Sequence, residues 1–139
     1  MVSSSYPLRH ELTPAVYFEQ GDYPKTIETC EKAIEEGRSL RADYKLFAKA
    51  FGRIGSAYLK QNDLENAIKF FQKSLTEHRT PDILTKLRET EKAKAEADRQ
   101  AYIDPAKAEE AREAGNTAFK AGQFAEAVKH YTEAIKRLP

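Results

Sequence analysis

The chain has 139 residues, of which 40% are hydrophobic and 32% charged, and its 23 lysines and arginines nearly balance 22 aspartates and glutamates. This composition suits one soluble helical domain or parts of two, and the missing basic excess argues against nucleic-acid binding. The sequence contains no apolar run of the roughly 18 residues that a transmembrane helix needs, and the lone Cys30 fits a reducing compartment, so we expect a cytoplasmic protein without a membrane partner.

In chain order, residues 1–13 form a leader that matches no later segment, and the helical pattern begins after it. Proline in the first helical turn, as in Thr80-Pro81 and Asp104-Pro105, indicates a helix start, because the nitrogen at that position has no intrahelical partner to lose. The apolar spacing predicts an all-α chain without strands. We expect helices over residues 24–37, 41–60, 64–78, 82–101, 106–121 and 124–137.

Three segments of the chain align without gaps: residues 17–33, 58–74 and 118–134. Each is typical of a helix end, a tight turn and a second helix. The turn residue is Gly21, Asn62 or Gly122, and both residue types tolerate the left-handed conformation that ends a helix. In the second helix a small residue precedes an aromatic one by four positions, as in Ala127 and Tyr131, which lets paired helices approach closely. The pattern therefore predicts antiparallel helix pairs.

The repeated positions resemble the consensus of the tetratricopeptide repeat, a helix-turn-helix unit of about 34 residues that stacks into a superhelix. The matching residues are Gly55, Tyr58, Ala67 and Phe71 in one copy and Gly115, Ala127, Tyr131, Ala134 and Pro139 in another. The alternative, a generic antiparallel helical bundle, has no reason to repeat glycine, aromatic and alanine at the same offsets. The expected core residues are Phe51, Ile54, Tyr58, Leu64, Ala67, Phe71, Leu75, Phe119, Phe124, Ala127 and Tyr131.

The turns are unevenly spaced, since the interval from Asn62 to Gly122 exceeds one repeat by about 26 residues. This insert carries a helix that begins at Thr80-Pro81 and then turns charged and alanine-rich, which is typical of a capping helix whose tail becomes a long linker helix. A new domain is expected to begin at Pro105.

The order of repeats, insert and joint closely resembles the heat-shock organising protein family, also called stress-inducible phosphoprotein, over roughly residues 15–139. The resemblance implies a truncated middle tetratricopeptide-repeat domain with a capping and linker helix over residues 14–101. It implies the first repeat of a second, truncated domain over residues 105–139, and leaves residues 1–13 as an unrelated leader.

The family resemblance also implies a co-chaperone adaptor that binds the acidic C-terminal tails of heat-shock protein 90 and heat-shock protein 70 through a carboxylate clamp. A peptide that ends in two carboxylates needs cations and amide donors at fixed spacing on a rigid scaffold. By the family pattern, the clamp residues here are Lys49 and Arg53 in one groove and Arg112 and Asn116 in another. Members of each pair are four residues apart and so share a helix face, although exposed cations on a solvated face are also common.

The sequence departs from the family pattern near its start. A clamp asparagine is expected where Leu12 stands, and leucine cannot donate a hydrogen bond. Pro14 replaces a small residue of a first helix, where it is expected to remove a helix hydrogen bond and clash with the preceding turn. Glu19 falls where the family contacts the bound tail. We therefore expect a partial clamp.

Other function classes find little support in the residues. His10, His78 and His130 show no metal-ligand spacing, and neither a phosphate-binding glycine loop nor a catalytic triad order occurs, so we expect no enzyme, metal or cofactor. A tetratricopeptide-repeat adaptor for a non-chaperone partner remains the alternative. The last hairpin has no following repeat in this sequence, so we expect it to be only locally stable or to pair with another copy.

Overall fold

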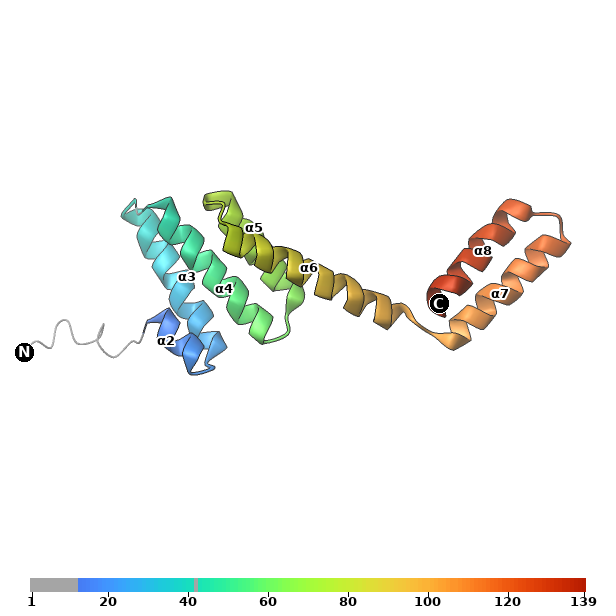
Figure 1. Ribbon diagram of the computed structural model, residues 1–139, viewed down its shortest axis with the longest axis horizontal. Coiled ribbons are helices and arrows are strands. Elements are labelled where there is room, and N and C mark those ends of the chain that lie inside the picture. Colours follow the sequence, from blue (N-terminus) through green and yellow to red (C-terminus); the bar gives the residue numbers. More distant parts are fainter. Residues whose placement is uncertain (1–12, 42) are drawn as a thin grey trace, which may run out of the picture. The chain divides into compact units, whose positions relative to one another are not determined.

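A computed structural model describes residues 13–41 and 43–139, which form seven α-helices and, within those ranges, no strand. The helices are α2 (Pro14–Glu19), α3 (Tyr23–Ser39), α4 (Tyr44–Lys60), α5 (Leu64–Glu77), α6 (Pro81–Tyr102), α7 (Pro105–Lys120) and α8 (Phe124–Arg137) (Figure 1). The chain divides into two compact units between Lys94 and Ala95, inside α6. Among the described helices, none combines the length and the apolar character that crossing a bilayer requires.

Capping side chains and prolines fix where the helices begin. The carboxylate of Asp63 accepts a hydrogen bond from the Asn66 backbone N–H (3.2 Å) at the start of α5, and that of Asp104 accepts from the Lys107 N–H (3.2 Å) at the start of α7. These bonds satisfy backbone donors that lack an intrahelical partner. Because the caps are local, the expected bounds of α5 and α7 agree with the structure to within one residue.

Two expectations about helix starts are wrong. Pro14 does not disrupt a helix but begins α2, a helix missing from the expected set, because its lack of an N–H costs nothing at the first position. The Thr13 hydroxyl caps this helix by accepting from the Val16 N–H (3.3 Å). Helix α4 begins at Tyr44 and not at residue 41, because Arg41 adopts a left-handed backbone conformation (φ 54°) that a helix cannot contain.

The tight turns between paired helices are confirmed. Gly21 (φ 79°), Asn62 (φ 61°) and Gly122 (φ 78°) all adopt the left-handed conformation that the aligned segments predict. Each turn reverses the chain, so α2 and α3, α4 and α5, and α7 and α8 form antiparallel pairs (Figure 1).

The core of the first unit consists of two clusters, one between α3 and α4 and one between α5 and α6. One cluster joins Ile27, Cys30 and Ile34 of α3 with Phe51, Ile54 and Ala57 of α4. A second cluster joins Ala67 and Phe71 of α5 with Leu87 of α6. The expected core residues Phe51, Ile54, Ala67 and Phe71 are buried, whereas Tyr58, Leu64 and Leu75 are half-buried at its edge.

Glycines in the first helix of a pair let an aromatic ring of the second helix approach the backbone. A Cβ atom on Gly55 would lie 2.7 Å from Cδ1 and Cε1 of Phe71, and one on Gly115 would lie 2.6 Å from the same atoms of Tyr131. Such distances are too short for a real contact. The repeated glycine and aromatic positions therefore form the same contact in each unit, Gly55 with Phe71 and Gly115 with Tyr131.

The second unit is a single helical hairpin, and many of its apolar side chains are exposed. Ala127 is buried and Tyr131 half-buried as expected, but the expectation that Phe119 and Phe124 belong to the core is wrong, because they are 57% and 58% exposed. Their rings contact each other edge-to-face at 5.3 Å, as Phe18 and Tyr23 do at 5.4 Å in the first unit. Phe18 and Tyr23 also pack against the core cluster that α3 and α4 share, whereas the second unit supplies only α7, α8 and the end of α6.

Within this unit, a cation–π contact and hydrogen bonds join the end of α6 and the residues after it to α8. The Arg137 guanidinium lies 3.6 Å from the centre of the Tyr102 ring and donates to the Tyr102 carbonyl (3.1 Å). The Tyr102 hydroxyl donates to Glu133, a bond that raises the pKa of Tyr102 and lowers that of Glu133. The Asp104 N–H also donates to the Arg137 carbonyl (2.8 Å), so the linker covers the last turn of α8.

We expect faster hydrogen exchange in the last hairpin than in the first unit. Val128 and Ile135 of α8 are 63% and 66% exposed, so opening this helix exposes little additional apolar surface. In a dilute monomer, backbone amides from Ala127 to Lys136 should be less protected than those from Ala67 to Ser74, as measured by amide exchange with mass spectrometry or NMR. Equal protection of the two segments would contradict the expectation.

Candidate functional site

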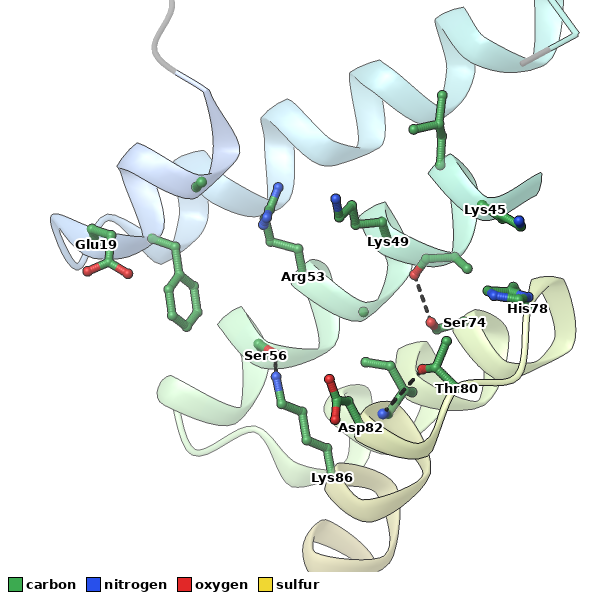
Figure 2. Close-up of a pocket in the computed structure, with 16 residues that line it drawn as sticks. Glu19, Lys45, Lys49, Arg53, Ser56, Ser74, His78, Thr80, Asp82 and Lys86 are labelled. Atoms are coloured by element: carbon green, nitrogen blue, oxygen red, sulfur yellow. Dashed lines mark hydrogen bonds between the residues drawn. The ribbon is translucent and has the colours of Figure 1, made fainter. Parts of the chain in front are cut away.

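An open groove of about 680 Å³ lies on the first unit, between α2, α4 and the start of α6 (Figure 2). Its cations are Lys45, Lys49 and Arg53 of α4 and Lys86 of α6, and its acidic residues are Glu19 and Asp82. The groove therefore has an excess of positive charge in a chain whose net charge is only +1.

The three cations of α4 form a row because they are spaced four residues apart along one helix face. The opposite face of α4 carries the buried Phe51 and Ile54, and their packing holds the cationic face toward the groove. Figure 2 shows Lys49 and Arg53 extending from α4 in the same direction. The structure thus brings together the first predicted clamp pair.

The described part of the chain supplies these cations with no acidic partner. Within residues 13–41 and 43–139, no ion pair engages Lys45, Lys49, Arg53 or Lys86. Like charges one turn apart cost a few tenths of a kcal/mol per pair, and a bound anion would relieve that repulsion. Nearby, burial raises the pKa of the Cys30 thiol to about 11 against an opposing effect of Arg53, so the thiol stays neutral and supplies no counter-charge.

The floor of the groove is formed by small residues. Gly52 lies between Lys49 and Arg53, and a Cβ atom there would lie 2.8 Å from Cδ1 of Ile83 on α6. The buried Ser74 hydroxyl donates to the Ala48 carbonyl (2.7 Å), which satisfies both groups. Small residues of α4 and α5 thus lie among the charged side chains that line the groove.

The second predicted clamp pair lies on α7, in the second unit. The Tyr131 hydroxyl donates to Oδ1 of Asn116 (2.5 Å), so the Asn116 amide is oriented with its NH₂ group left to donate. Arg112 instead pairs with Glu109, whose carboxylate raises the pKa of the arginine while the pKa of Glu109 is lowered. Arg112 lines a shallow hollow of about 380 Å³ with Tyr131 and Ile135, whereas Asn116 does not.

Some residues of the groove were not predicted from the sequence. Lys45 could have been found, because it continues the four-residue spacing of Lys49 and Arg53. Lys86 and Asp82 could not, because only the packing of α6 brings them to the groove. Leu12, the expected site of a missing clamp asparagine, lies outside the described residues. In the described ranges, no three histidine, cysteine, aspartate or glutamate side chains are grouped as a metal site would need.

Comparison with known proteins agrees with this description. A tetratricopeptide-repeat family model matches residues 15–76. The chain is 59% identical over 125 residues to the heat shock protein sti1 homologue of Schizosaccharomyces pombe, and 55% identical over 129 residues to Hsp70-Hsp90 organizing protein 3 of Arabidopsis thaliana. Each match covers 90% of this chain but only 21% and 23% of those proteins, so the chain spans about a fifth of their length.

A solved structure is similar over most of the chain. The TPR2AB-domain:pHSP90 complex of yeast Sti1 matches with a TM-score of 0.88 and 52% sequence identity, covering 91% of this chain and 49% of that one. The all-α tetratricopeptide-repeat fold expected from the sequence is thereby confirmed.

Proposed function

We propose that this chain, which belongs to the heat-shock organising protein family of tetratricopeptide-repeat proteins, is a co-chaperone adaptor whose groove binds the acidic C-terminal tails of heat-shock protein 90 and heat-shock protein 70. The observation that carries the proposal is the row of Lys45, Lys49 and Arg53 along one wall of an open groove, which forms no ion pair with the described residues. A terminal carboxylate next to an acidic side chain complements such a row. Support also comes from the similar yeast structure, which is a complex with pHSP90.

In this proposal Lys49 and Arg53 hold the terminal carboxylate, and the planar guanidinium of Arg53 can donate two parallel hydrogen bonds to it. Arg112 and Asn116 are the corresponding pair of the second unit: Tyr131 orients the Asn116 amide to donate, and Arg112 exchanges its Glu109 partner for the peptide carboxylate. Residues 14–101 then correspond to the end of the family's middle domain with its linker, and residues 105–139 to the first repeat of its last domain. The proposed location is the cytoplasm, and no catalytic role is proposed.

The second candidate function is an adaptor for a non-chaperone partner. Its support is the groove's apolar lining, which includes Phe18, Ile83 and the 59% exposed Leu46, because such a surface can bind a side chain without any terminal carboxylate. The two candidates differ in what they require of the ligand. Chaperone-tail binding requires a free C-terminus, and the alternative does not.

We expect the groove to bind a free C-terminal acidic peptide and to lose most of that binding when the terminus is amidated. The amide removes one negative charge and cannot accept paired hydrogen bonds from Arg53. NMR titration of the full chain with chaperone-tail peptides in both forms measures the difference, and its sensitivity suits the modest affinity expected of a partial clamp. Equal affinity for the two forms would favour the non-chaperone adaptor.

A further inference from the structure

The groove carries a cation that the clamp does not use. Lys86 comes from α6, whereas Lys45, Lys49 and Arg53 all come from α4. Its Nζ atom donates to the hydroxyl of Ser56 (3.4 Å), a residue of α4 that also lines the groove (Figure 2). Two helices therefore contribute a cation and a hydroxyl to the same end of the groove.

Lys86 has capacity to bind a further partner. An ammonium group has three donors, and a neutral hydroxyl satisfies only one of them without compensating the charge. Asp82 stands one helical turn before Lys86 and lines the same groove, yet the two form no ion pair among the described residues. The ammonium lies at Ser56 instead, with its charge available to an incoming anion.

The position of this cation along the groove is set by α4. Ser56 is seven residues after Lys49 on the same face, which places it roughly 10 Å along the helix axis at 1.5 Å per residue. An extended peptide advances about 3.3 Å per residue. A peptide that runs along α4, with its terminal carboxylate at the Lys49 end of the clamp pair, therefore reaches Ser56 and Lys86 about three residues before its end.

We propose that Lys86 and Ser56 form a second anion-binding position in the groove, which takes an acidic side chain about three residues before the C-terminus of the bound peptide. The proposal rests on the proposed function for its register, and it names a specificity determinant beyond the carboxylate clamp. The carboxylate of the peptide side chain accepts hydrogen bonds from the Lys86 ammonium and from the Ser56 hydroxyl, which the ammonium holds in place.

A double-mutant cycle on the full chain tests this position. The probes are two pentapeptides, acetyl-Ala-Glu-Ala-Ala-Asp and acetyl-Ala-Gln-Ala-Ala-Asp, both with a free C-terminus. We expect the glutamate peptide to bind roughly two- to fivefold more tightly than the glutamine peptide, as suits a partly exposed ion pair. Lys86→Met, which keeps the apolar stem of the side chain, should remove this preference.

Lys45→Met is the matched control, because it removes the same charge from the other end of the same groove. It should weaken both peptides equally and keep the glutamate preference. The proposal is overturned if the wild-type chain shows no preference, if Lys86→Met leaves the preference intact, or if Lys45→Met removes it as well. Circular dichroism of each variant checks that the helices are retained.

The experiment separates this proposal from the proposed function. If binding requires the free C-terminus but the glutamate and glutamine peptides bind equally well, the clamp is supported and the role of Lys86 is overturned. With both peptides also prepared as C-terminal amides, a glutamate preference that depends on Lys86 and persists in the amides keeps the anion-binding position and overturns the clamp.

Discussion

Replacing Phe71 with alanine is expected to lower the free energy of unfolding of the first unit by about 3–5 kcal/mol, the range for a fully buried phenylalanine. Phe71 is 0% exposed and belongs to the cluster with Ala67 and Leu87. Its ring also lies against the backbone of Gly55, where no side chain can move in to fill the space. The substitution therefore leaves a cavity bounded by α4, α5 and α6.

Urea denaturation followed by circular dichroism measures this loss. Tyr44→Ala is the matched control in the same unit, because Tyr44 is 51% exposed and its ring packs against the His78 ring with the two centroids 5.6 Å apart. It should cost less than about 1 kcal/mol, as surface substitutions usually do. A loss well below 1 kcal/mol for Phe71→Ala would show that the ring is not part of the core.

The second large effect is expected from Arg53→Ala, which should weaken binding of a free-carboxylate tail peptide at least tenfold. A hydrogen bond to a charged group contributes about 1.5–3 kcal/mol, and tenfold in affinity corresponds to about 1.4 kcal/mol. Arg53 is only half-exposed and has no ion-pair partner among the described residues, so its donors are available to the ligand. The affinity of Arg53→Lys should lie between those of the wild-type chain and Arg53→Ala, because lysine keeps the charge but lacks the planar pair of donors.

NMR titration of each 139-residue variant with the same peptide provides the comparison. Lys92→Ala is the control for net charge, because Lys92 is exposed on α6 and does not line the groove. We expect it to change affinity less than about twofold, the size of a screened distant charge. If Arg53→Ala and Lys92→Ala have the same small effect, Arg53 does not contact the carboxylate.

The sequence alone determined the described helices other than α2, their pairing and part of the groove. Caps such as Asp63 and Asp104, prolines in first turns and left-handed residues such as Asn62 act within a few residues of where they stand, so their effect can be predicted locally. The row of Lys49 and Arg53 was predictable for the same reason. A four-residue spacing on a helix fixes a shared face whatever packs against the other side.

Tertiary structure alone decided which surfaces are covered. Phe119 and Phe124 occupy the same repeat positions as Phe18 and Tyr23, yet only the latter pair packs against a core shared with a further helix. Burial depends on the neighbouring helix, which no periodicity within the hairpin specifies. Lys86 reaches the groove in the same way, because Ile83 and Leu87 pack α6 against α4 and α5 and so carry the cation to Ser56. The repeat sequence specifies each helix pair, and contacts with helices distant in the sequence decide which side chains of that pair are exposed.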